Sequence, residues 1–528
     1  MTVLLSLSQC HTNEIDFSDI ELPNYTGEVV VPLGTATYTV ADLLTDLEDE
    51  SLEIDTAQSG LLSLIYRDTT TFTNTDEVIV INDVSNNGFI DSPVEIIGAT
   101  PSEVGDVEFT QDLEFLYPID GGDQLDSINY SMGQITITYE SDFDVPLSFS
   151  MVIDDIIDRA TGNPLVLTGI AAPNGSGNQS QSLVNHKTIA RQNNSNENSF
   201  TGTFLGTLDV GAGDNVYTTD QFRYTIDITG ADFETIYGYF GEKNYDLFDQ
   251  SIAMDFFDQL DGEIKFSSPE VRIIVDNSFG LTMGLNLSNI STSNANSSQT
   301  LTGSVTEQLQ FINGPDIYSV GSSRTSSVRI NNTNSNIADL FSISPNMVNL
   351  TINAQSNYSN SPNRVPEDDR NFTDQNSTAS TIVEVELPLN LQLRQLTRHI
   401  DYSLSDFSFD QADTINLRIK TNNRLPMSGT LDLQFLDADS AVVYESKNVS
   451  IFTSPEVPAG SNINEPVVNI DFIPLFGEGL DALFNQPTIR IVIHVDSYDV
   501  ENDTYVKIFA DYALEILLGV EATLDVEL

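Results

Sequence analysis

One stretch of the sequence places oxygen-bearing side chains at the spacing of a calcium-binding loop. Asp83, Ser85, Asn87 and Asp91 stand at loop positions 1, 3, 5 and 9, and Gly88 at position 6 permits the sharp turn that such loops need. Position 12, where a calcium loop carries a bidentate Glu, is occupied by Val94. Because Asn-Gly alone is a strong hairpin signal, the stretch predicts either a calcium site or a plain turn.

A second stretch, Tyr237-Gly238-Tyr239-Phe240-Gly241, concentrates aromatic rings. A Gly beside each Tyr can leave one face of the ring open to a ligand such as a glycan, so Tyr237 and Tyr239 are candidate ligand-binding residues. The alternative is that these rings fill the core of a β-sandwich. The chain has no Trp, and this absence weakens the case for a glycan platform.

The sequence contains no recognisable catalytic frame. It has four His, and it lacks a GxSxG elbow, an HExxH motif and a Walker-type phosphate loop. Its 79 acidic residues are too many for proximity in sequence to single out an opposed pair of carboxylates. We therefore expect a protein that is not an enzyme and that needs no cofactor, apart from calcium at the stretch described above.

The charge balance excludes further classes of partner. The chain has 20 Lys and Arg against 79 Asp and Glu, which gives a formal net charge of −59 over 528 residues. Such a charge repels phosphate backbones, so we do not expect a nucleic-acid partner. Hydrophobic residues make up 40% of the chain, which is enough to form packed cores. The single cysteine excludes an intramolecular disulfide.

That cysteine, Cys10, follows a short apolar run and is followed at once by polar chain. This arrangement resembles the end of a bacterial lipoprotein signal, in which the cysteine becomes the acylated first residue of the mature protein. Gln9 departs from the small residue usual before that cysteine, and no Lys or Arg precedes Arg67. We therefore expect 1–10 to be a signal remnant whose true start lies upstream. The alternative is a cysteine buried in a terminal strand.

The dominant periodicity along the chain is two. Apolar and polar residues alternate in 134–139, 415–419 and 431–435, which is typical of half-buried antiparallel strands. Turn-forming residues fill the gaps between such runs. The sequence therefore predicts an all-β protein built from tandem antiparallel β-sandwiches.

Three segments share a pattern of strand, bend and second strand, with Asn or Asp and a Pro or Gly in the bend: 135–153, 271–287 and 415–435. They begin 136 and 144 residues apart, a domain-sized spacing that favours repetition over chance similarity among hairpins. We therefore expect a tether and N-terminal β region followed by three sandwiches. The expected boundaries are 11–105, 106–245, 246–385 and 386–528.

Helical periodicity is rare in this sequence. Phe248, Ile252, Phe256 and Leu260 recur every four residues and predict an amphipathic helix over 247–260. A short helical turn is expected over 480–484. We expect these one or two short helices to close the open ends of sandwiches.

Taken together, these features resemble the uncharacterised, acidic, β-rich outer-membrane lipoproteins of Bacteroidota type. The matching features are Cys10 after Leu7-Ser8, the stretch 237–241, and strand units such as 415–435, which also resemble immunoglobulin-like or late-embryogenesis-abundant sandwiches. The resemblance implies an outer-membrane location, on the periplasmic side or the cell surface, with attachment through an N-terminal lipid. We expect a non-enzymatic scaffold or binding module whose partners are envelope proteins or glycans. The alternative is a surface lipoprotein that binds or processes glycans.

Overall fold

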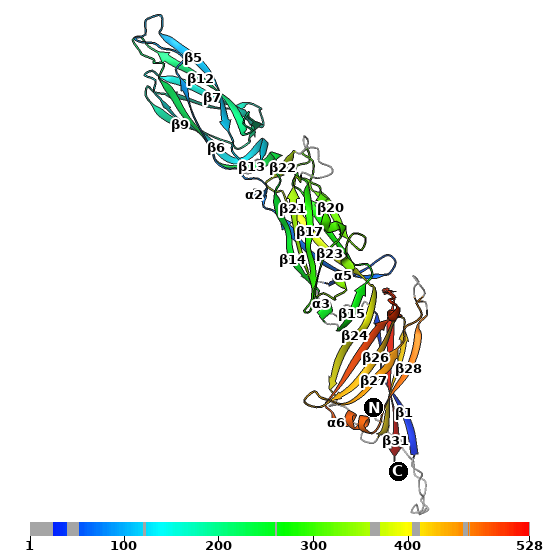
Figure 1. Cartoon of the computed structure of the whole chain (residues 1–528). Helices are drawn as coiled ribbons and strands as arrows, with labels where there is room; N and C mark the ends of the chain where they lie inside the picture. The colour runs from blue at the N-terminus through cyan, green and yellow to red at the C-terminus, as the bar shows by residue number, and fades with distance from the viewer. Residues whose placement is uncertain are drawn as a thin grey trace, which may run out of the picture.

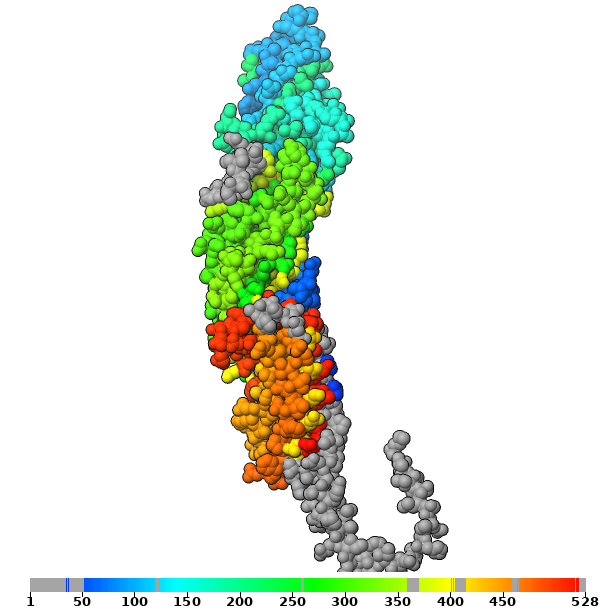
Figure 2. Space-filling model, turned by 90° about the vertical axis from the view of Figure 1, so that its right-hand side faces the viewer, coloured from blue at the N-terminus to red at the C-terminus, as the bar shows by residue number. Residues whose placement is uncertain are grey.

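The structure is a computed structural model that describes residues 25–39, 52–119, 123–258, 261–358, 370–403, 412–457, 463 and 465–526. Strands account for 62% of it and helices for 6%, and its sheets are antiparallel, so the predicted all-β, sandwich-like class is confirmed. Three lobes follow one another in a row (Figure 1). A view turned by 90° shows the same narrow rod (Figure 2).

The distal lobe is the one farthest from strands β1 (Tyr25–Thr39) and β31 (Ala513–Val526), and it contains one antiparallel sheet of 11 strands. Its central order is β11-β12-β7-β10-β6-β13-β22, and β5, β4, β8 and β9 pair at its sides. The strands are β4 (Val84–Asp91), β5 (Gly105–Leu116), β6 (Gln124–Ser141), β7 (Leu147–Asp158), β8 (Pro164–Ala171), β9 (Ser176–Ser182), β10 (His186–Ile189), β11 (Arg191–Gln192), β12 (Asn198–Val210), β13 (Gln221–Tyr239) and β22 (Asn371–Asp374).

The middle lobe packs two five-stranded sheets against each other. One sheet has the order β2-β3-β23-β16-β20, and the other has the order β14-β21-β17-β18 with β19 beside β17. The strands are β2 (Leu52–Thr56), β3 (Leu62–Phe72), β14 (Asn244–Ala253), β16 (Glu270–Asn277), β17 (Met283–Ser293), β18 (Ser298–Thr300), β19 (Gln310–Ile312), β20 (Arg324–Ile330), β21 (Met347–Ser356) and β23 (Ala379–Pro388).

The terminal lobe holds the first and last described strands. Its four-stranded sheet has the order β1-β31-β25-β28, and its six-stranded sheet has the order β15-β24-β29-β26-β27 with β30 beside β24. The strands are β1 (Tyr25–Thr39), β15 (Asp261–Phe266), β24 (Asn390–Ser403), β25 (Ala412–Asn423), β26 (Met427–Leu436), β27 (Val442–Phe452), β28 (Val467–Leu475), β29 (Thr488–Ser497), β30 (Val506–Lys507) and β31 (Ala513–Val526).

The N-terminal segment contributes strands to all three lobes. β1 pairs with β31 in the terminal lobe, β3 pairs with β23 in the middle lobe, and β4 pairs with β13 in the distal lobe. In addition, β15 pairs with β24 across the expected boundary at 385. The domain boundaries stay a prediction of the sequence, but hydrogen-bonded ladders run across them. The ends of the rod are therefore connected by the early part of the chain.

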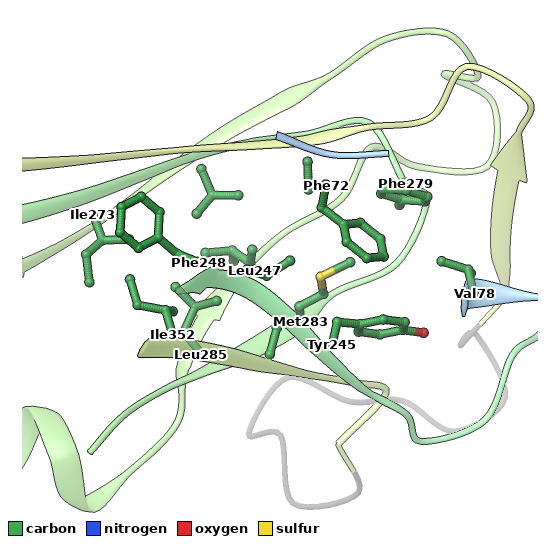
Figure 3. Packing of buried hydrophobic residues seen from close by; sticks show 14 of the residues in the cluster. Phe72, Val78, Tyr245, Leu247, Phe248, Ile273, Phe279, Met283, Leu285 and Ile352 are labelled. Carbon is green, nitrogen blue, oxygen red and sulfur yellow. The ribbon is translucent and has the colours of Figure 1, made fainter. Parts of the chain in front are cut away.

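The alternation of side chains builds the core of each lobe. In β16 and β21 every second residue is buried, as period two requires. Figure 3 shows how the two sheets of the middle lobe meet, with Tyr245 and Phe248 of β14 facing Phe72 of β3 and Ile273 of β16. Leu247 and Phe248 are neighbours and are both buried, because a register shift between Asp246 and Phe248 bulges the strand.

The three strand–bend–strand segments form the corners β6–β7, β16–β17 and β25–β26. The second and third corners carry the chain from one sheet of a lobe to the other, whereas the first stays within one sheet. A buried Asn ends the first strand of the latter two corners. The Asn277 amide donates to Leu281 O (3.1 Å) and accepts from Phe279 N, and the Asn423 amide bonds in the same way to Met427 O (2.9 Å) and Leu425 N.

The described residues contain five short helices, more than the one or two expected: α2 (Thr75–Val78), α3 (Asp255–Asp258), α4 (Ser304–Glu307), α5 (Ile337–Phe341) and α6 (Glu478–Asn485). The helix expected over 247–260 is wrong, because Phe248 and Ile252 lie on β14 and only α3 is helical. Residues four apart share a face in a strand as well as in a helix, so this spacing was ambiguous. The turn expected over 480–484 is confirmed as α6.

Candidate functional site

A shallow, open groove of about 620 Å³ lies on the surface of the distal lobe. Strands β4, β13, β6 and β9, which are neighbours in that order, supply its walls. The lining residues are Asn87, Gly88, Phe89, Thr138, Tyr139, Glu140, Ser176, Arg223, Tyr224 and Thr225. The groove lies far from the middle lobe, because β13 meets β22 at Thr235, about 40 Å along the strand from Arg223.

One row of side chains crosses all four strands of the groove. Phe89 is opposite Arg223, Arg223 is opposite Glu140, and Glu140 is opposite Ser176. All four are exposed, and the Phe89 side chain retains 54% of its accessible surface. Because directly opposite residues in antiparallel strands have Cβ atoms about 5 Å apart, an aromatic ring, a cation and an anion are adjacent.

The guanidinium of Arg223 is held in place by a neighbouring carboxylate. Its Nη1 donates to Asp142 Oδ1 at 2.9 Å, and its Nη2 lies 2.6 Å from Asp142 Oδ2. This hydrogen bonding and the attached negative charge raise the pKa of Arg223. A two-contact pair of this kind fixes the plane of the guanidinium.

A second row of the groove carries neutral polar groups. Asn87 is opposite Thr225, and Thr225 is opposite Thr138. The side chains of these three residues make no hydrogen bond to any other part of the chain that the structure describes. Their amide and hydroxyl groups can therefore donate to or accept from a ligand.

Two tyrosines and two edge glycines form the row that lies between the row of Arg223 and the row of Thr225. Gly88, Tyr224, Tyr139 and Gly177 follow one another across the sheet. The Tyr224 ring lies over Gly88 and the Tyr139 ring over Gly177, so closely that a Cβ added at either glycine would clash with the hydroxyl oxygen above it. Both tyrosines are buried, and burial raises the pKa of Tyr224.

Aromatic packing supports these tyrosines from inside the lobe. Tyr139 contacts Phe149 edge-on and stacks on Phe222, with ring centroids 4.8 and 5.6 Å apart, and Tyr224 contacts Phe115. Close-packed rings leave little freedom to move. The groove is therefore a preformed surface.

The sequence predicts a calcium site or a plain turn at 83–91, and in the structure residues 84–91 of this stretch form strand β4. Asp83, Ser85, Asn87 and Asp91 follow one exposed face of an extended chain about 27 Å long and do not gather around a point. Asp83 accepts a hydrogen bond from Gly230 N, and Asp91 accepts one from Gln221. Only Asn87 lines the groove.

Asn86, between the expected ligands, closes the side of the lobe. Its amide exchanges two hydrogen bonds with the backbone of Leu116, at 2.9 and 2.8 Å, and so joins β4 to β5. The Asn86 side chain thus takes the place of backbone pairing between β4 and β5. Among the described residues, no group of three or more His, Cys, Asp or Glu is placed to hold a metal ion.

Tyr237 and Tyr239 lie at the other end of β13, where the distal and middle lobes meet. Both rings are half-buried, and Tyr237 packs near Phe372 of β22, with ring centroids 6.2 Å apart. Burial raises the pKa of Tyr237, and the nearby Arg159 opposes that effect. The structure does not bring these two residues to the groove.

Cys10 and the remnant 1–10 lie outside the described residues. Within the described ranges, no helix is both long enough and apolar enough to cross a membrane.

A Thr–His–Asp arrangement on β24, β29 and β26 was not expected from the sequence. His494 Nδ1 lies 3.0 Å from Thr397 Oγ1, and its Nε2 lies 3.4 Å from Asp432 Oδ2. The Thr397 hydroxyl also contacts Gln395 O at 3.0 Å, so its single proton can be directed to a carbonyl. His494 is thus a strand residue with satisfied hydrogen bonds.

Sequence reasoning missed Phe89, Arg223 and Glu140 as groove residues. They are 134 and 83 residues apart in the chain (223 − 89; 223 − 140), and only strand pairing makes them neighbours. The one local signal was Gly88 beside an aromatic residue, Phe89.

No protein-family model matches the chain, and the search of curated proteins finds no match. Among solved structures, the chain is similar to a Parabacteroides distasonis protein described as secreted, with 11% identity and a TM-score of 0.31 over 94% of this chain and 99% of that one. It is more distantly similar to the VP2 subviral particle of infectious bursal disease virus, with 7% identity and a TM-score of 0.13 over 90% of this chain and 82% of that one.

Proposed function

We propose that this chain is a non-enzymatic, lipid-anchored protein of the bacterial cell envelope that serves as a binding module. Its anchor is a lipid on Cys10, and its partner is an envelope protein or a glycan held at the groove of the distal lobe. The observation that carries the proposal is the position of that groove, at the opposite end of the rod from the lobe that holds β1 and β31.

The connection between the N-terminus and the rod supports this orientation. Tyr25, where β1 begins, is 15 residues after Cys10 (25 − 10), a stretch that reaches about 50 Å at most. An anchor at Cys10 therefore keeps the terminal lobe near the membrane. The middle lobe then separates the groove from the bilayer.

Hydrogen bonds at the two joints between the lobes stabilise the separation of the groove from the terminal lobe. At the distal joint, β22 pairs with the end of β13, and Asn371 and Asn357 exchange amide hydrogen bonds at 2.8 and 3.1 Å. At the terminal joint, Leu62 N donates to Ile508 O and Leu389 N to Leu62 O. Paired strands and buried amides make stiff connections.

The chemistry of the groove supports binding over bond cleavage. Glu140 and Asp142 are two positions apart at the end of one strand, but Asp142 is engaged by Arg223 through both of its oxygens. Hydrolysis by paired carboxylates needs one acid that is free to donate a proton and a second that faces it across the substrate. Two carboxylates on the same side of a groove do not supply that arrangement.

Site-specific photo-crosslinking tests the proposal. A photoreactive phenylalanine analogue at Phe89 places the probe in the groove, and the same residue at Phe476, 64% exposed in the terminal lobe, is the matched control. In native membranes we expect an adduct from position 89 that is absent from position 476. Identical adducts from both positions, or none from position 89, would contradict the proposal. Hydrolase activity that is lost in Glu140→Gln would also contradict it.

A further inference from the structure

We infer that the ligand of the distal groove is a neutral glycan. This inference rests on the proposed function, because it names the class of ligand that the same groove binds. It follows from three features of the groove: its charge, its free hydrogen-bonding groups and its exposed ring.

The charge of the groove disfavours anionic ligands. Arg223 is the cation of the site, and Asp142 and Glu140 lie beside it, so the local charge is +1 − 1 − 1 = −1. The remainder of the chain adds a strongly negative field, since the whole carries −59. A phosphate, a sulfate or a uronic acid would be repelled, whereas a neutral ligand would not.

The hydrogen-bonding groups of the groove suit a ligand that is rich in hydroxyl groups. Asn87, Thr138, Thr225 and Ser176 each can donate and accept, and Glu140 accepts with two oxygens. None of these five side chains bonds to another side chain or backbone group among the described residues. Hydroxyl groups on adjacent sugar carbons both donate and accept, so they complement such a surface.

The exposed ring of Phe89 is the third feature of the groove that suits a glycan. Phe89 stands at one side of the groove with half of its surface open, next to the fixed plane of the Arg223 guanidinium. The C–H face of a pyranose is apolar and can pack on an aromatic ring, as an apolar surface leaving water does. Four strands spaced by about 4.8 Å make the groove about 14 Å wide, which accommodates a short oligosaccharide.

The firm base of the groove lowers the cost of binding. Tyr139 and Tyr224 are locked over Gly177 and Gly88 and are packed on the aromatic core, so the outer rows need not reorganise when a ligand arrives. A preformed surface loses less conformational entropy on binding.

Affinity electrophoresis of the full chain tests the inference. Native gels containing neutral polysaccharides (β-glucan, xylan, mannan or dextran) are compared with gels containing polygalacturonate or alginate. We expect at least one neutral polysaccharide, and neither acidic one, to retard the protein. Phe89→Ala should weaken the interaction about five- to tenfold. The matched control, Phe476→Ala, should bind as the wild type does, and circular dichroism checks that both variants are folded.

The outcomes separate this inference from the proposed function. Retardation by acidic polysaccharides alone, by no polysaccharide, or equally by wild type and Phe89→Ala would overturn the assignment of a neutral glycan. If the crosslinker at position 89 still captures an envelope protein, the binding module stands and only the ligand class is wrong. If there is neither a crosslink nor retardation, both are wrong.

Discussion

Gly88 shows how one small residue shapes the candidate site. Gly88 lies in the middle of β4, although glycine is normally unfavourable inside a strand. It is accommodated here because the ring of Tyr224 on the paired strand occupies the space that a side chain would fill. Gly177 and Tyr139 repeat the arrangement on the other side of the groove. Aromatic rings that cover glycines on neighbouring strands are a known means of fixing sheet register.

Gly88→Ala should therefore destabilise the distal lobe by about 1–3 kcal/mol, the usual cost of overpacking. The measurement is urea unfolding monitored by circular dichroism. Ser85→Ala, at an exposed position of the same strand, serves as the control and should change stability by less than about 0.5 kcal/mol. Equal stability of the two variants would show that Tyr224 does not need the space over Gly88.

Lys243 and the buried Asp123 form a partly buried ion pair at the joint between the distal and middle lobes. Lys243 Nζ lies 2.6 Å from Asp123 Oδ2 and also donates to Val78 O at 2.5 Å, and the Asp123 side chain is 1% exposed. Burial raises the pKa of Asp123 above its ordinary value of 3.8, and the Lys243 ammonium opposes that rise. The cation is therefore what makes an ionised carboxylate tolerable here.

Lys243→Met should destabilise the chain by about 3–5 kcal/mol at pH 7, because it leaves the Asp123 charge buried without its partner. A carboxyl whose pKa is raised by folding holds its proton more tightly in the folded state. The stability that Asp123 contributes is therefore greatest below pH 3.8 and is lost as the pH rises through its folded-state pKa. The variant should lose more stability than the wild type between acidic and neutral pH.

Unfolding free energies of the two proteins over that pH range check this prediction. The double variant Asp123→Asn with Lys243→Met removes both charges and should abolish the extra pH dependence. An equal deficit of Lys243→Met at every pH would mean that Asp123 is not the group responsible.

At the scale of elements, a ladder of charged side chains joins strands of the middle lobe. Glu384 on β23 binds Arg67 on β3 (Nε–Oε2, 2.6 Å) and Arg272 on β16 (Nη1–Oε1, 2.7 Å), and Arg272 also pairs with Glu270 and Glu386. Hydrogen bonding to Glu384 raises the pKa of Arg67. Glu384 is therefore the buried centre of the ladder.

Glu384→Gln should lower the unfolding free energy by about 3 kcal/mol, because it leaves two guanidinium groups without their shared partner. Glu53 ends the same ladder on Arg67, but its side chain is 60% exposed, so Glu53→Gln should cost less than about 1 kcal/mol. Guanidinium chloride screens charges, so the comparison uses urea unfolding. Similar losses for the two variants would show that burial does not set the strength of this ladder.

The elements also show what the sequence could predict. Period two in 415–419 and 431–435 located β25 and β26, because each side chain there is simply inward or outward. The strand at 84–91 could not be predicted from the local sequence, because Asn-Gly in isolation favours a turn. Only the Tyr224 ring, on a strand distant in sequence, explains the glycine at this position. Phe89 and Arg223 likewise meet only through pairing of β4 with β13.

At the scale of the whole molecule, the first and last described strands lie in one lobe, and the chain passes through the other two lobes between them. β1, β3 and β4 lie within the first 91 residues yet belong to three different lobes. Periodicity does not report which distant strand a strand pairs with, so the sequence could not predict this path. The path has a mechanical consequence, because unfolding of any lobe must disturb the N-terminal segment that all three share.

The orientation of the rod on the membrane can be measured by energy transfer between the protein and the lipid. An acceptor dye in the lipid and a fluorescent unnatural amino acid at Phe476 in the terminal lobe, or at Ile170 in the distal lobe, allow energy transfer to be compared; both side chains are exposed. With the native protein in its membrane, we predict strong transfer from position 476 and little from position 170. Equal transfer from both positions, or stronger transfer from position 170, would contradict a groove held away from a lipid-anchored end.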